Sequence, residues 1–533
     1  MNLQNVKPIP PVAAPASWDE ETDVLVMGGG GGGLAAAWGA VEAGAGVTVL
    51  EKADAVGGES AMANSAVAFG SRLWQETLTK SWTEDELYHH LRSLPKSEDM
   101  AKLADPRLLK NNLVWAAYLM DGLSDMGIKW QVADVSADHP GVLRFTPVST
   151  ELTDYSAAPP FQFKFGCVIR TLERWLRGRG VEFRLGAIVT ALVSDGRGRV
   201  TGVRVQAKDG GVRYFKAGAV IDSTGGFACN RDMLEHYNNV GIYAGCTTSP
   251  PTKTGDGIRM CQGMGAMVGD MTSVHGAAGG ITTLKRGTGN KAWVQNFYDT
   301  PIQLLRQLGL YVNRYGLRFT NEQLTAYAAY QLLMDQPGGV IYSLFDVDWN
   351  GAKAMAEKAV FFNDGDIRKM ADNPPYTPYY ASSALPFGDW HEGIERAVAS
   401  GVIRVADTIE ELATGYGIDS RRLKRTVDEY NAGCDRGKDA PLFGKSAESL
   451  RPIRKPPFYA LEHGPRIIDT RGGVTVNERG QVINGGGDAV GGLYAGSFSI
   501  SGVTGRGGAI GVVGGMAFGY VAGKSAAAEV SAP

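Results

Sequence analysis

The sequence predicts an α/β fold: a domain built around a parallel sheet from both ends of the chain, with an α+β cap domain inserted into it. A short apolar strand, a glycine turn, an alanine-rich helix and a second strand follow one another in residues 23–51, which is the order of a βαβ unit. The 72 glycines gather at particular places, and residues 275–455 contain fewer glycines and more aromatic residues. We therefore expect two domains, the first of them discontinuous.

The composition is that of an ordinary globular protein. The hydrophobic fraction is 44%, and 53 basic and 56 acidic residues give a net charge of −3 and a pI near 6.2. This balance does not favour binding to nucleic acid or to an anionic membrane. The five cysteines are widely spaced and form no CxxC pair, which argues against a disulfide framework or a metal site and favours the reducing cytoplasm.

Two segments bear on targeting. Residues 1–20 lack the basic and apolar regions of a signal peptide and are expected to form a flexible arm. Residues 505–528 are the longest apolar-rich stretch, but many glycines, Arg506 and Lys524 interrupt it. We expect a buried strand, loop and helix there, and no transmembrane segment.

Gly28, Gly30 and Gly33 form a Gly-x-Gly-x-x-Gly motif between the first strand and the helix. In such a motif the first glycine makes the turn, the second lets the backbone approach a pyrophosphate, and the third allows close packing of helix and strand. Glu51 ends the second strand 18 residues after Gly33 (51 − 33), where a carboxylate accepts hydrogen bonds from ribose hydroxyls. A low-complexity turn would explain the glycines alone, but the strand, helix and acid in register favour a dinucleotide site.

The other elements follow from local periodicity and turn residues. They are a helical stretch in residues 84–128, loops over the site in 131–160, a helix leading into a strand in 172–189, a meander in 200–220 with a turn at 209–211, and a strand at 219–223. The expected boundaries are 1–20 for the arm, 21–275 and 456–533 for the two parts of the cofactor domain, and 276–455 for the inserted substrate or cap domain.

Beyond the glycine motif, the chain carries further short motifs in a characteristic order. They are Glu51-Lys52 followed by Gly57-Gly58-x-Ser60, Ser223-Thr-Gly-Gly-Phe227, Thr254-Gly-Asp-Gly257, residues 312–322 ending in Arg-Phe-Thr-Asn-Glu, Pro457-Phe-Tyr-Ala460, Gly472-Gly473, and Gly491-Gly-Leu-Tyr-Ala-Gly496. Together they resemble the flavoproteins of the fumarate reductase and succinate dehydrogenase family, and within it the 3-ketosteroid dehydrogenases. The resemblance covers nearly the whole chain from Asp23. It implies non-covalent FAD on a two-dinucleotide-binding, Rossmann-type domain with an inserted catalytic domain.

The resemblance also implies a cofactor site. Val189 would meet the adenine through its backbone, and a helix N-terminus near Gly508 would cover the flavin pyrimidine, where it stabilises the negative charge of reduced flavin. Ser497 departs from the family, in which an acid or an asparagine often stands at this place. The expected cofactor-binding residues are Gly28, Gly30, Gly31, Gly32, Gly33, Glu51, Lys52, Gly57, Gly58, Glu59, Ser60, Val189, Thr224, Gly225, Gly226, Asp256, Gly496, Ser497, Gly508, Ala509 and Ile510.

A tyrosine stands where the family's two reactions differ. Fumarate reductases of this family place an arginine shortly after the Asn-Glu motif, whereas Asn321-Glu322 is followed here by Tyr327, which is similar to the ketosteroid dehydrogenases. We expect Tyr327 to be the base, with Tyr330 as its competitor and core packing as the structural alternative. A tyrosine of ordinary pKa, about 10, needs a polar helper, which is Tyr155 by resemblance unless Tyr155 is an ordinary loop residue.

Two more residues are candidates for binding the substrate. Arg506 stands near the place where fumarate-reductase-like members bind substrate through an arginine. Its guanidinium can polarise a ketone or grip a carboxylate, the latter with the better geometric match, and a salt bridge between domains is the structural alternative. His275 also falls near the expected substrate pocket, although a single histidine is more often structural.

These residues lead to three functional hypotheses. The first is an FAD-dependent dehydrogenase that introduces a C=C bond beside a ring ketone, either in a ketosteroid or in a smaller oxocyclohexane-type substrate that can carry a carboxylate. The second is a reductase of an α,β-unsaturated acid, and a weaker third is a non-catalytic flavin-binding protein. The expected partners are a cyclic ketone or unsaturated acid and an electron acceptor that the sequence does not identify.

Overall fold

The computed structural model describes residues 2–63, 66–78, 83, 85–86, 89, 106–133, 144–148, 165–238, 249–280, 309–322, 332–349, 395, 398–399, 401, 403–502 and 511–531. The chain divides into two compact units. Unit 1 comprises Met1–Asn239, Ser249–His275 and Asp469–Pro533, and unit 2 includes Gly276–Ile468. The chain leaves unit 2 after Ile468, 13 residues (468 − 455) beyond the boundary expected from the sequence, because a long strand belongs mostly to the sheet of unit 2.

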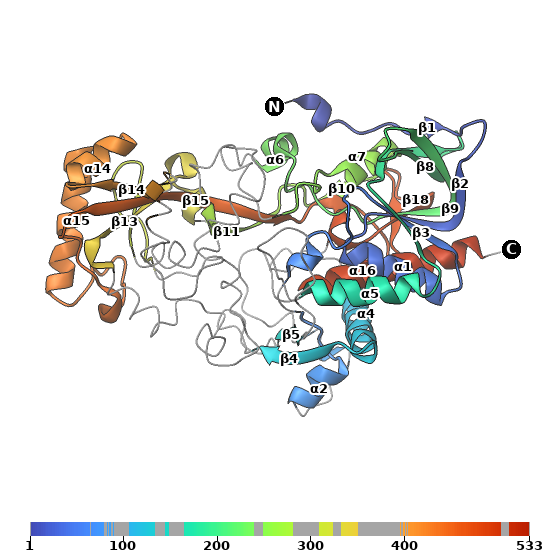
Figure 1. Cartoon of the computed structure of the whole chain (residues 1–533), viewed down its shortest axis with the longest axis horizontal. Coiled ribbons are helices and arrows are strands. Elements are labelled where there is room, and N and C mark those ends of the chain that lie inside the picture. Colours follow the sequence, from blue (N-terminus) through green and yellow to red (C-terminus); the bar gives the residue numbers. More distant parts are fainter. Residues whose placement is uncertain are drawn as a thin grey trace. The chain divides into compact units, whose positions relative to one another are not determined.

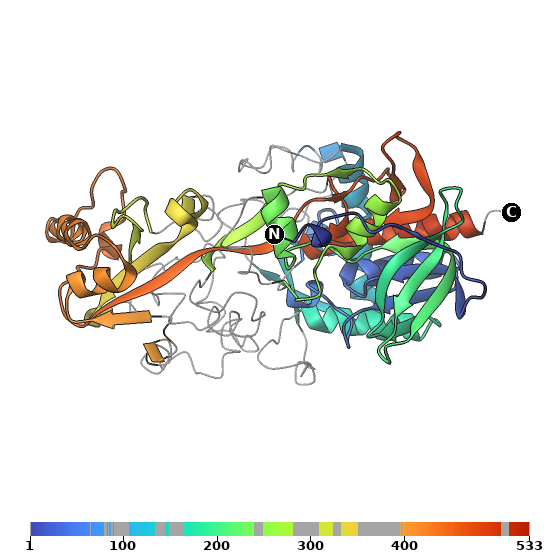
Figure 2. The ribbon, with the colours of Figure 1, turned by 90° about the horizontal axis from the view of Figure 1, so that it is seen from above.

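Unit 1 is built on a sheet that has nine strands among the described residues, in the order β1-β7-β8-β9-β2-β3-β6 with β18 beside β9 and β17 beside β18. Parallel pairs run through β6, β3, β2, β9 and β18, and antiparallel pairs join β7, β8 and β9 (Figure 2). The strands are β1 (Val12–Ala13), β2 (Glu20–Met27), β3 (Val47–Glu51), β6 (Glu182–Leu185), β7 (Ile188–Ser194), β8 (Val200–Gln206), β9 (Val212–Asp222), β17 (Gln481–Ile483) and β18 (Ala489–Ala495).

The βαβ unit expected from the sequence is present. Strand β2 leads through the glycine turn into helix α1 (Gly31–Glu42), and the chain returns in β3, which pairs with β2 in parallel. Residues 24–27 and all of β3 are buried, which explains why residues 24–27 form a continuous apolar run rather than an alternating one. The predicted meander is also confirmed, since β8 and β9 pair antiparallel around a turn in which Gly210 has φ +82°.

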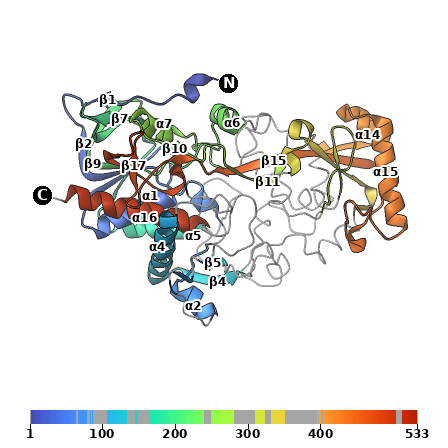
Figure 3. The ribbon, with the colours of Figure 1, turned by 180° about the vertical axis from the view of Figure 1, so that it is seen from behind.

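Helix α1 packs closely against helix α16 (Gly511–Val530), as Figures 1 and 3 show. Glycines permit this approach. A Cβ atom at Gly519 would lie 2.0 Å from the carbonyl oxygen of Gly32, and one at Gly523 would lie 1.9 Å from that of Ala36. The described part of the apolar stretch 505–528 is therefore this helix. Unit 1 also contains the helices α2 (Arg72–Leu78), α4 (Pro106–Asp125), α5 (Phe165–Arg177), α6 (Arg231–Asn238) and α7 (Asp256–Gly263) and the short strands β4 (Lys129–Ala133), β5 (Arg144–Val148), β10 (Val268–Gly269) and β16 (Gly473–Val474).

The structure corrects the expectation that residues 1–20 form a flexible arm. Val12 and Ala13 form a parallel ladder with β7, and the N–H of Ile9 donates to the carbonyl of Arg259, at 2.9 Å. Two atoms of the guanidinium of Arg259 donate in turn to backbone carbonyls of the segment, and Asp232 accepts hydrogen bonds from two of its asparagines. These bonds cannot be read from the residue types, because most of them use backbone atoms of the segment, which any sequence supplies.

Unit 2 contains an antiparallel sheet in the order β11-β15-β13-β12, with β14 also paired to β15. Its core joins this sheet to two helices, and the buried residues of this core include Leu310, Leu344, Leu412 and Val427. The strands are β11 (Val274–Gly280), β12 (Leu310–Asn313), β13 (Ile341–Asp346), β14 (Ile403–Ala406) and β15 (Phe458–Thr470), and the helices are α14 (Ile409–Tyr416) and α15 (Ser420–Asp435) (Figure 1). In the part of the chain described by the structure, no helix has the length and apolar character needed to cross a membrane.

Candidate functional site: a dinucleotide-binding cradle in unit 1

The glycine loop between β2 and α1 has room for a side chain at Gly30 but none at Gly33. A Cβ atom at Gly33 would lie 1.8 Å from the carbonyl oxygen of Gly28, so close packing requires glycine there. At Gly30 the nearest atom to such a Cβ is the carbonyl oxygen of Gly57, at 4.0 Å. Gly30 therefore borders free space at the carboxyl ends of the strands, where dinucleotides bind in this kind of fold.

The start of α1 is free to bind an anion. Its N-cap is Gly30, which has no side chain to accept hydrogen bonds from the first N–H groups of the helix. These N–H groups and the helix dipole favour negative charge at this end. The neighbouring loop closes one side, because the N–H of Gly57 donates to the carbonyl of Gly29 at 2.8 Å. The arrangement fits a pyrophosphate.

Glu51 has a structural contact that sequence reasoning missed. One carboxylate oxygen accepts the N–H of Gly29 at 2.7 Å, and the other accepts the N–H of Ala53 at 2.8 Å. The side chain thereby holds the glycine turn against the end of β3. Since each carboxylate oxygen has two lone pairs, Glu51 keeps the capacity to accept hydrogen bonds from ribose hydroxyls.

The loop after β9 carries a buried hydroxyl group that has no hydrogen-bond partner in the described part of the chain. The Oγ atom of Ser223 has no hydrogen-bond partner among the described residues, and it lies 3.0 Å from the position of a Cβ atom at Gly32. Buried polar atoms are normally paired, so this atom is consistent with a ligand in the cradle. Next to it, the N–H of Gly225 donates to Ser499 at 2.8 Å, which joins this loop to the segment after β18.

Asp222, at the end of β9, anchors the same loop. Its carboxylate accepts hydrogen bonds from the N–H and the hydroxyl of Thr224, at 3.0 and 2.8 Å. Burial raises the pKa of Asp222 to about 6, although these hydrogen bonds act in the opposite direction. The carboxyl group thus titrates much closer to neutrality than an exposed aspartate.

Two expected cofactor residues, Ser60 and Ser497, lie close to the first turn of α1, and a third, Gly496, lies against α16. A Cβ atom at Gly31 would lie 2.6 Å from the Oγ atom of Ser60. A Cβ atom at Gly32 would lie 2.2 Å from the Cβ of Ser497. Ser497 has φ +63°, a conformation that few residues other than glycine adopt. Gly496 allows α16 to approach, because a Cβ there would lie 2.7 Å from the Cα of Gly519.

Other expected cofactor residues are paired with protein side chains. Lys52 donates to the hydroxyl of Thr254 at 2.7 Å and pairs with Asp256 at 3.1 Å. Glu59, beside Gly57-Gly58, pairs with the buried Lys253. Val189 lies in β7, opposite Val205 of β8. The structure thus gives Lys52 and Asp256 a role in joining the loop after β3 to the start of α7.

His275 belongs to a buried cluster that the sequence did not reveal. Arg471 Nη2 donates to His275 Nδ1 at 3.1 Å, and Arg471 Nε forms an ion pair with Asp469 at 2.9 Å. Burial acts to raise the pKa of Asp469, but Arg471, His275 and Lys253 together outweigh it and hold that pKa below its usual range. The available signal was two charged residues, Asp469 and Arg471, that flank Thr470 directly before the Gly472-Gly473 motif.

The expected catalytic residues lie outside the described residues. They are Tyr155, Tyr327, Tyr330 and Arg506, together with the cofactor candidates Gly508, Ala509 and Ile510. Five residues before Tyr327 (327 − 322), Glu322 is part of a buried charge network in unit 2. Arg318 pairs there with Glu322 at 2.8 Å and with Asp439 at 2.6 Å, which explains the Arg-Phe-Thr-Asn-Glu motif as a structural anchor.

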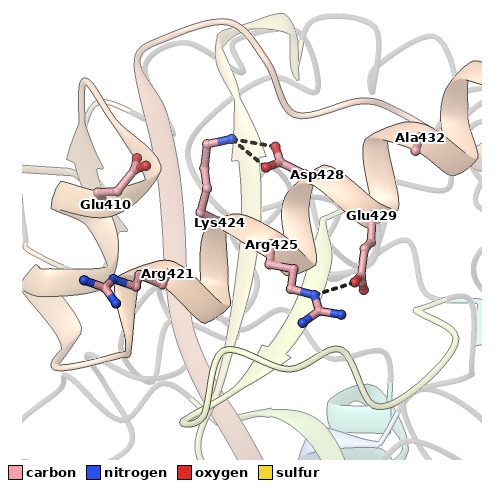
Figure 4. A pocket seen from close by; sticks show the side chains of 7 residues that line it. All are labelled: Glu410, Arg421, Lys424, Arg425, Asp428, Glu429 and Ala432. Carbon is pink, nitrogen blue, oxygen red and sulfur yellow. Dashed lines mark hydrogen bonds and ion pairs between the residues drawn. The ribbon is translucent and has the colours of Figure 1, made fainter.

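A surface groove on helices α14 and α15 of unit 2 is not a cofactor site. Its charged side chains pair with one another: Lys424 with Asp428 at 2.6 Å, and Arg425 with Glu429 at 2.9 Å (Figure 4). Both pairs are one helical turn apart, which is the ordinary arrangement of a solvated helix face. The groove is lined by Glu410, Arg421, Lys424, Arg425, Asp428, Glu429 and Ala432.

The cradle in unit 1 defines a class of protein. A parallel sheet, an uncapped helix start, a carboxylate at the end of β3 and an unpartnered serine hydroxyl fit FAD, and flavin-dependent oxidoreductases bind it in this way. A family model described as "FAD binding domain" matches residues 23–512, and the chain belongs to this family. The cofactor expected from the sequence is thereby confirmed.

The curated relatives include reductases and a dehydrogenase. The chain is 28% identical over 521 residues to an NADH:acrylate oxidoreductase of Vibrio harveyi, and the match covers 90% of this chain and 47% of that protein. It therefore spans about half the length of this relative. It is 26% identical over 540 residues to a fumarate reductase (cytochrome) of Shewanella frigidimarina, covering 97% and 79%. It is 26% identical over 584 residues to a 4-oxocyclohexanecarboxylate 2-dehydrogenase of Sinomonas cyclohexanicum, covering 96% and 93%.

Solved structures confirm the fold class. The open conformation of a flavocytochrome c3 fumarate reductase matches with a TM-score of 0.70 at 24% identity, covering 97% of this chain and 80% of that one. A 3-ketosteroid-Δ4-(5α)-dehydrogenase from Rhodococcus jostii RHA1 matches with a TM-score of 0.66 at 22% identity, covering 97% of this chain and all of that one. Both kinds of enzyme that the sequence resembles thus share its fold.

Proposed function

We propose that this protein is an FAD-dependent dehydrogenase that introduces a C=C bond between the α and β carbons of a ring ketone. The observation that carries the proposal is Tyr327, which follows Asn321-Glu322 where the fumarate-reductase branch of the family has an arginine. A relative named as a 4-oxocyclohexanecarboxylate 2-dehydrogenase, matched over 93% of its length, supports a small carboxylated ring as the substrate. A ketosteroid is the larger alternative within the same reaction.

The residues divide the work as follows. FAD in the cradle supplies the acceptor for the hydride that leaves the β carbon, at flavin N5. Tyr327 takes the α-proton, with Tyr155 as its hydrogen-bonding helper and Tyr330 as the competing base. Arg506 grips the carboxylate, for which a guanidinium has the matching fork of donors. The phenolate form of Tyr327 takes the α-proton and becomes the neutral phenol, the electron pair of the α C–H bond forms the new C=C bond, and the pair of the β C–H bond leaves with the hydride.

A second candidate is the reverse reaction on an α,β-unsaturated acid. The names of the acrylate and fumarate reductases among the relatives favour it, as does Arg506. The natural electron acceptor or donor stays open in both candidates. Mixing the yellow protein with 4-oxocyclohexanecarboxylate without oxygen separates them. The dehydrogenase bleaches its flavin with the ketone, whereas a protein that keeps its yellow colour but oxidises reduced viologen with acrylate or fumarate is a reductase.

Tyr327→Phe tests the base directly. Removing the hydroxyl should slow flavin bleaching by the ketone by roughly 10²- to 10⁴-fold, the range for general base catalysis, and leave the flavin spectrum unchanged. Tyr330→Phe is the matched control and should keep most of the rate. If the two variants exchange these results, Tyr330 is the base, and if both remain fully active, no tyrosine of this segment takes the proton.

A further inference from the structure

Arg471 is a buried guanidinium with part of its donor set unused. Its side chain is 8% exposed, and its Cζ atom lies 5.0 Å from the centre of the Phe498 ring. Nε is paired with Asp469 and Nη2 donates to His275, whereas Nη1 has no hydrogen-bond partner among the described residues. An arginine pinned at two of its three nitrogens presents the third in a fixed direction, which is the property of a preorganised donor.

The position of Arg471 is tied to the loops of the FAD cradle. The preceding residue, Thr470, accepts the N–H of Phe227 through its hydroxyl at 2.9 Å. A Cβ at Gly226 would lie 2.2 Å from the same hydroxyl oxygen, so the loop after β9 packs directly on this segment. Arg471 thus follows a residue that is in contact with the cofactor loop, and the ring of Phe498 beneath it follows Ser497.

The charges around Arg471 suit an oxygen that becomes negative only during the reaction. Asp469 is ionised and neutralises the guanidinium, and Glu59 does the same for the nearby Lys253. Two cations and two anions leave this group of four side chains without net charge. A full anion gains little from such a group, whereas fixed N–H donors still stabilise charge that develops on a carbonyl oxygen.

The histidine contact supports the same role. Arginine only donates, so His275 Nδ1 accepts at 3.1 Å, and this is shorter than its 3.4 Å separation from Asp469. The imidazole therefore holds Nη2 of the guanidinium in place through Nδ1. Asp469 and His275 act as positioning residues that hold the guanidinium on both sides.

We propose that Arg471 Nη1 donates a hydrogen bond to the ketone oxygen of the substrate and stabilises the enolate charge as the α-proton leaves. This inference rests on the proposed ketone dehydrogenase function. It separates two arginine roles: a single free nitrogen matches the one oxygen of a ketone, whereas Arg506 is assigned to the carboxylate.

The test compares two ligands that differ in one oxygen. 4-Hydroxybenzoate has an oxygen opposite its carboxylate, like the enolate of a 4-oxocyclohexane acid, and benzoate lacks it. Both are titrated into the oxidised holoenzyme by flavin absorbance. Arg471→Gln should weaken 4-hydroxybenzoate by about 10- to 100-fold, the range for a hydrogen bond to a charged group, and benzoate by less than about twofold. Arg506→Gln should weaken both ligands alike.

Arg471→Lys keeps the test sound if the glutamine variant fails to hold FAD. A lysine retains the charge without the fixed plane, so it should lose less 4-hydroxybenzoate affinity than glutamine and leave benzoate unchanged. Equal weakening of both ligands, an unchanged affinity for 4-hydroxybenzoate, or no binding of it to the wild-type holoenzyme would overturn the proposal.

Flavin reduction separates this inference from the function on which it rests. If wild-type enzyme is bleached by 4-oxocyclohexanecarboxylate, Arg471→Gln should slow the bleaching by about 10²- to 10³-fold, as removal of one oxyanion donor does. A wild-type enzyme that no ring ketone bleaches refutes the dehydrogenase function, whatever the ligand titrations give. An active wild type whose Arg471→Gln variant reacts at an unchanged rate refutes the role of Arg471 alone.

Discussion

Gly30 and Gly33 lie in one turn of chain, yet their missing side chains matter for different reasons. At Gly33 the obstacle to a methyl group is the protein's own backbone, at 1.8 Å. A Cβ atom at Gly30 would have its nearest protein neighbour outside the adjoining residues 4.0 Å away. The φ angle of Gly30 is −71°, which any residue adopts. Gly33 is therefore needed by the fold, and Gly30 by the ligand.

This difference yields a matched pair of substitutions. Gly30→Ala should leave the melting temperature of the FAD-free protein unchanged and weaken FAD binding about tenfold or more, because the methyl group occupies space for the pyrophosphate. Gly33→Ala should lower the stability of the FAD-free protein by about 1–3 kcal/mol or more through overpacking. Calorimetry of the FAD-free proteins and fluorescence titration with FAD measure both. An unchanged FAD affinity in Gly30→Ala would place the pyrophosphate elsewhere.

Asp222 makes stability depend on pH in a definite direction. Its pKa in the folded protein is about 6, above its ordinary value of 3.8, so the folded state binds this proton more tightly than the unfolded state. The stabilisation from this proton is complete below pH 3.8 and is lost as the pH rises through 6. An uncharged residue at this position has no such loss.

The stability of the Asp222→Asn variant relative to wild type should therefore differ between pH 5 and pH 8. Compared with wild type, the melting temperature of the variant should be lower at pH 5 and should rise relative to it at pH 8, because only wild type then carries a buried carboxylate. Other acidic groups titrate in both proteins and cancel in the comparison. A melting-temperature difference that is the same at both pH values would contradict the raised pKa of Asp222.

Individual residues of the cradle could be predicted from the sequence, but their partners could not. Glu51 and the glycines stand at fixed spacings along one βαβ unit, so local pattern places them. Arg471 lies 196 residues (471 − 275) after His275, and only the fold brings the two together. The base and the carboxylate ligand, Tyr327 and Arg506, stay predictions from the sequence.

At the scale of elements, the contact between α1 and α16 is a close helix–helix joint of unit 1. Gly39 faces the carbonyl of Tyr520 across it, and a Cβ at this position would lie 2.3 Å from that oxygen. Most residues of both helices are apolar and buried, as in helices that are covered on most sides. Their composition predicted helices and burial, but it did not predict that they pack on each other.

Gly523→Ala tests this joint. Its methyl group would lie 1.9 Å from the carbonyl of Ala36, so the helices must separate, and the free energy of unfolding should fall by about 1–3 kcal/mol or more. Lys524→Ala, one residue further on an exposed position, should cost no more than about 1 kcal/mol. Urea denaturation of the FAD-free proteins measures both values. Equal losses in the two variants would show that the close approach is not what stabilises the pair.

At the scale of the whole molecule, the sequence indicated a discontinuous flavin domain, and the structure shows two units whose chain crossing lies within β15 rather than before it. A long strand shared between units has no turn residue to mark the crossing, which is why composition placed it 13 residues too early (468 − 455). The opposite error concerned the N-terminal segment, which is joined to the rest of unit 1 by backbone hydrogen bonds that no residue type announces.

The joint between α1 and α16 can form only after nearly the whole chain has been synthesised. Helix α1 ends at Glu42 and α16 begins at Gly511, 469 residues later (511 − 42). At about 5–20 residues per second, a ribosome needs roughly 25 to 95 s between them. Throughout that interval the apolar surface of α1 that α16 will cover stays open on the nascent chain, available to chaperones.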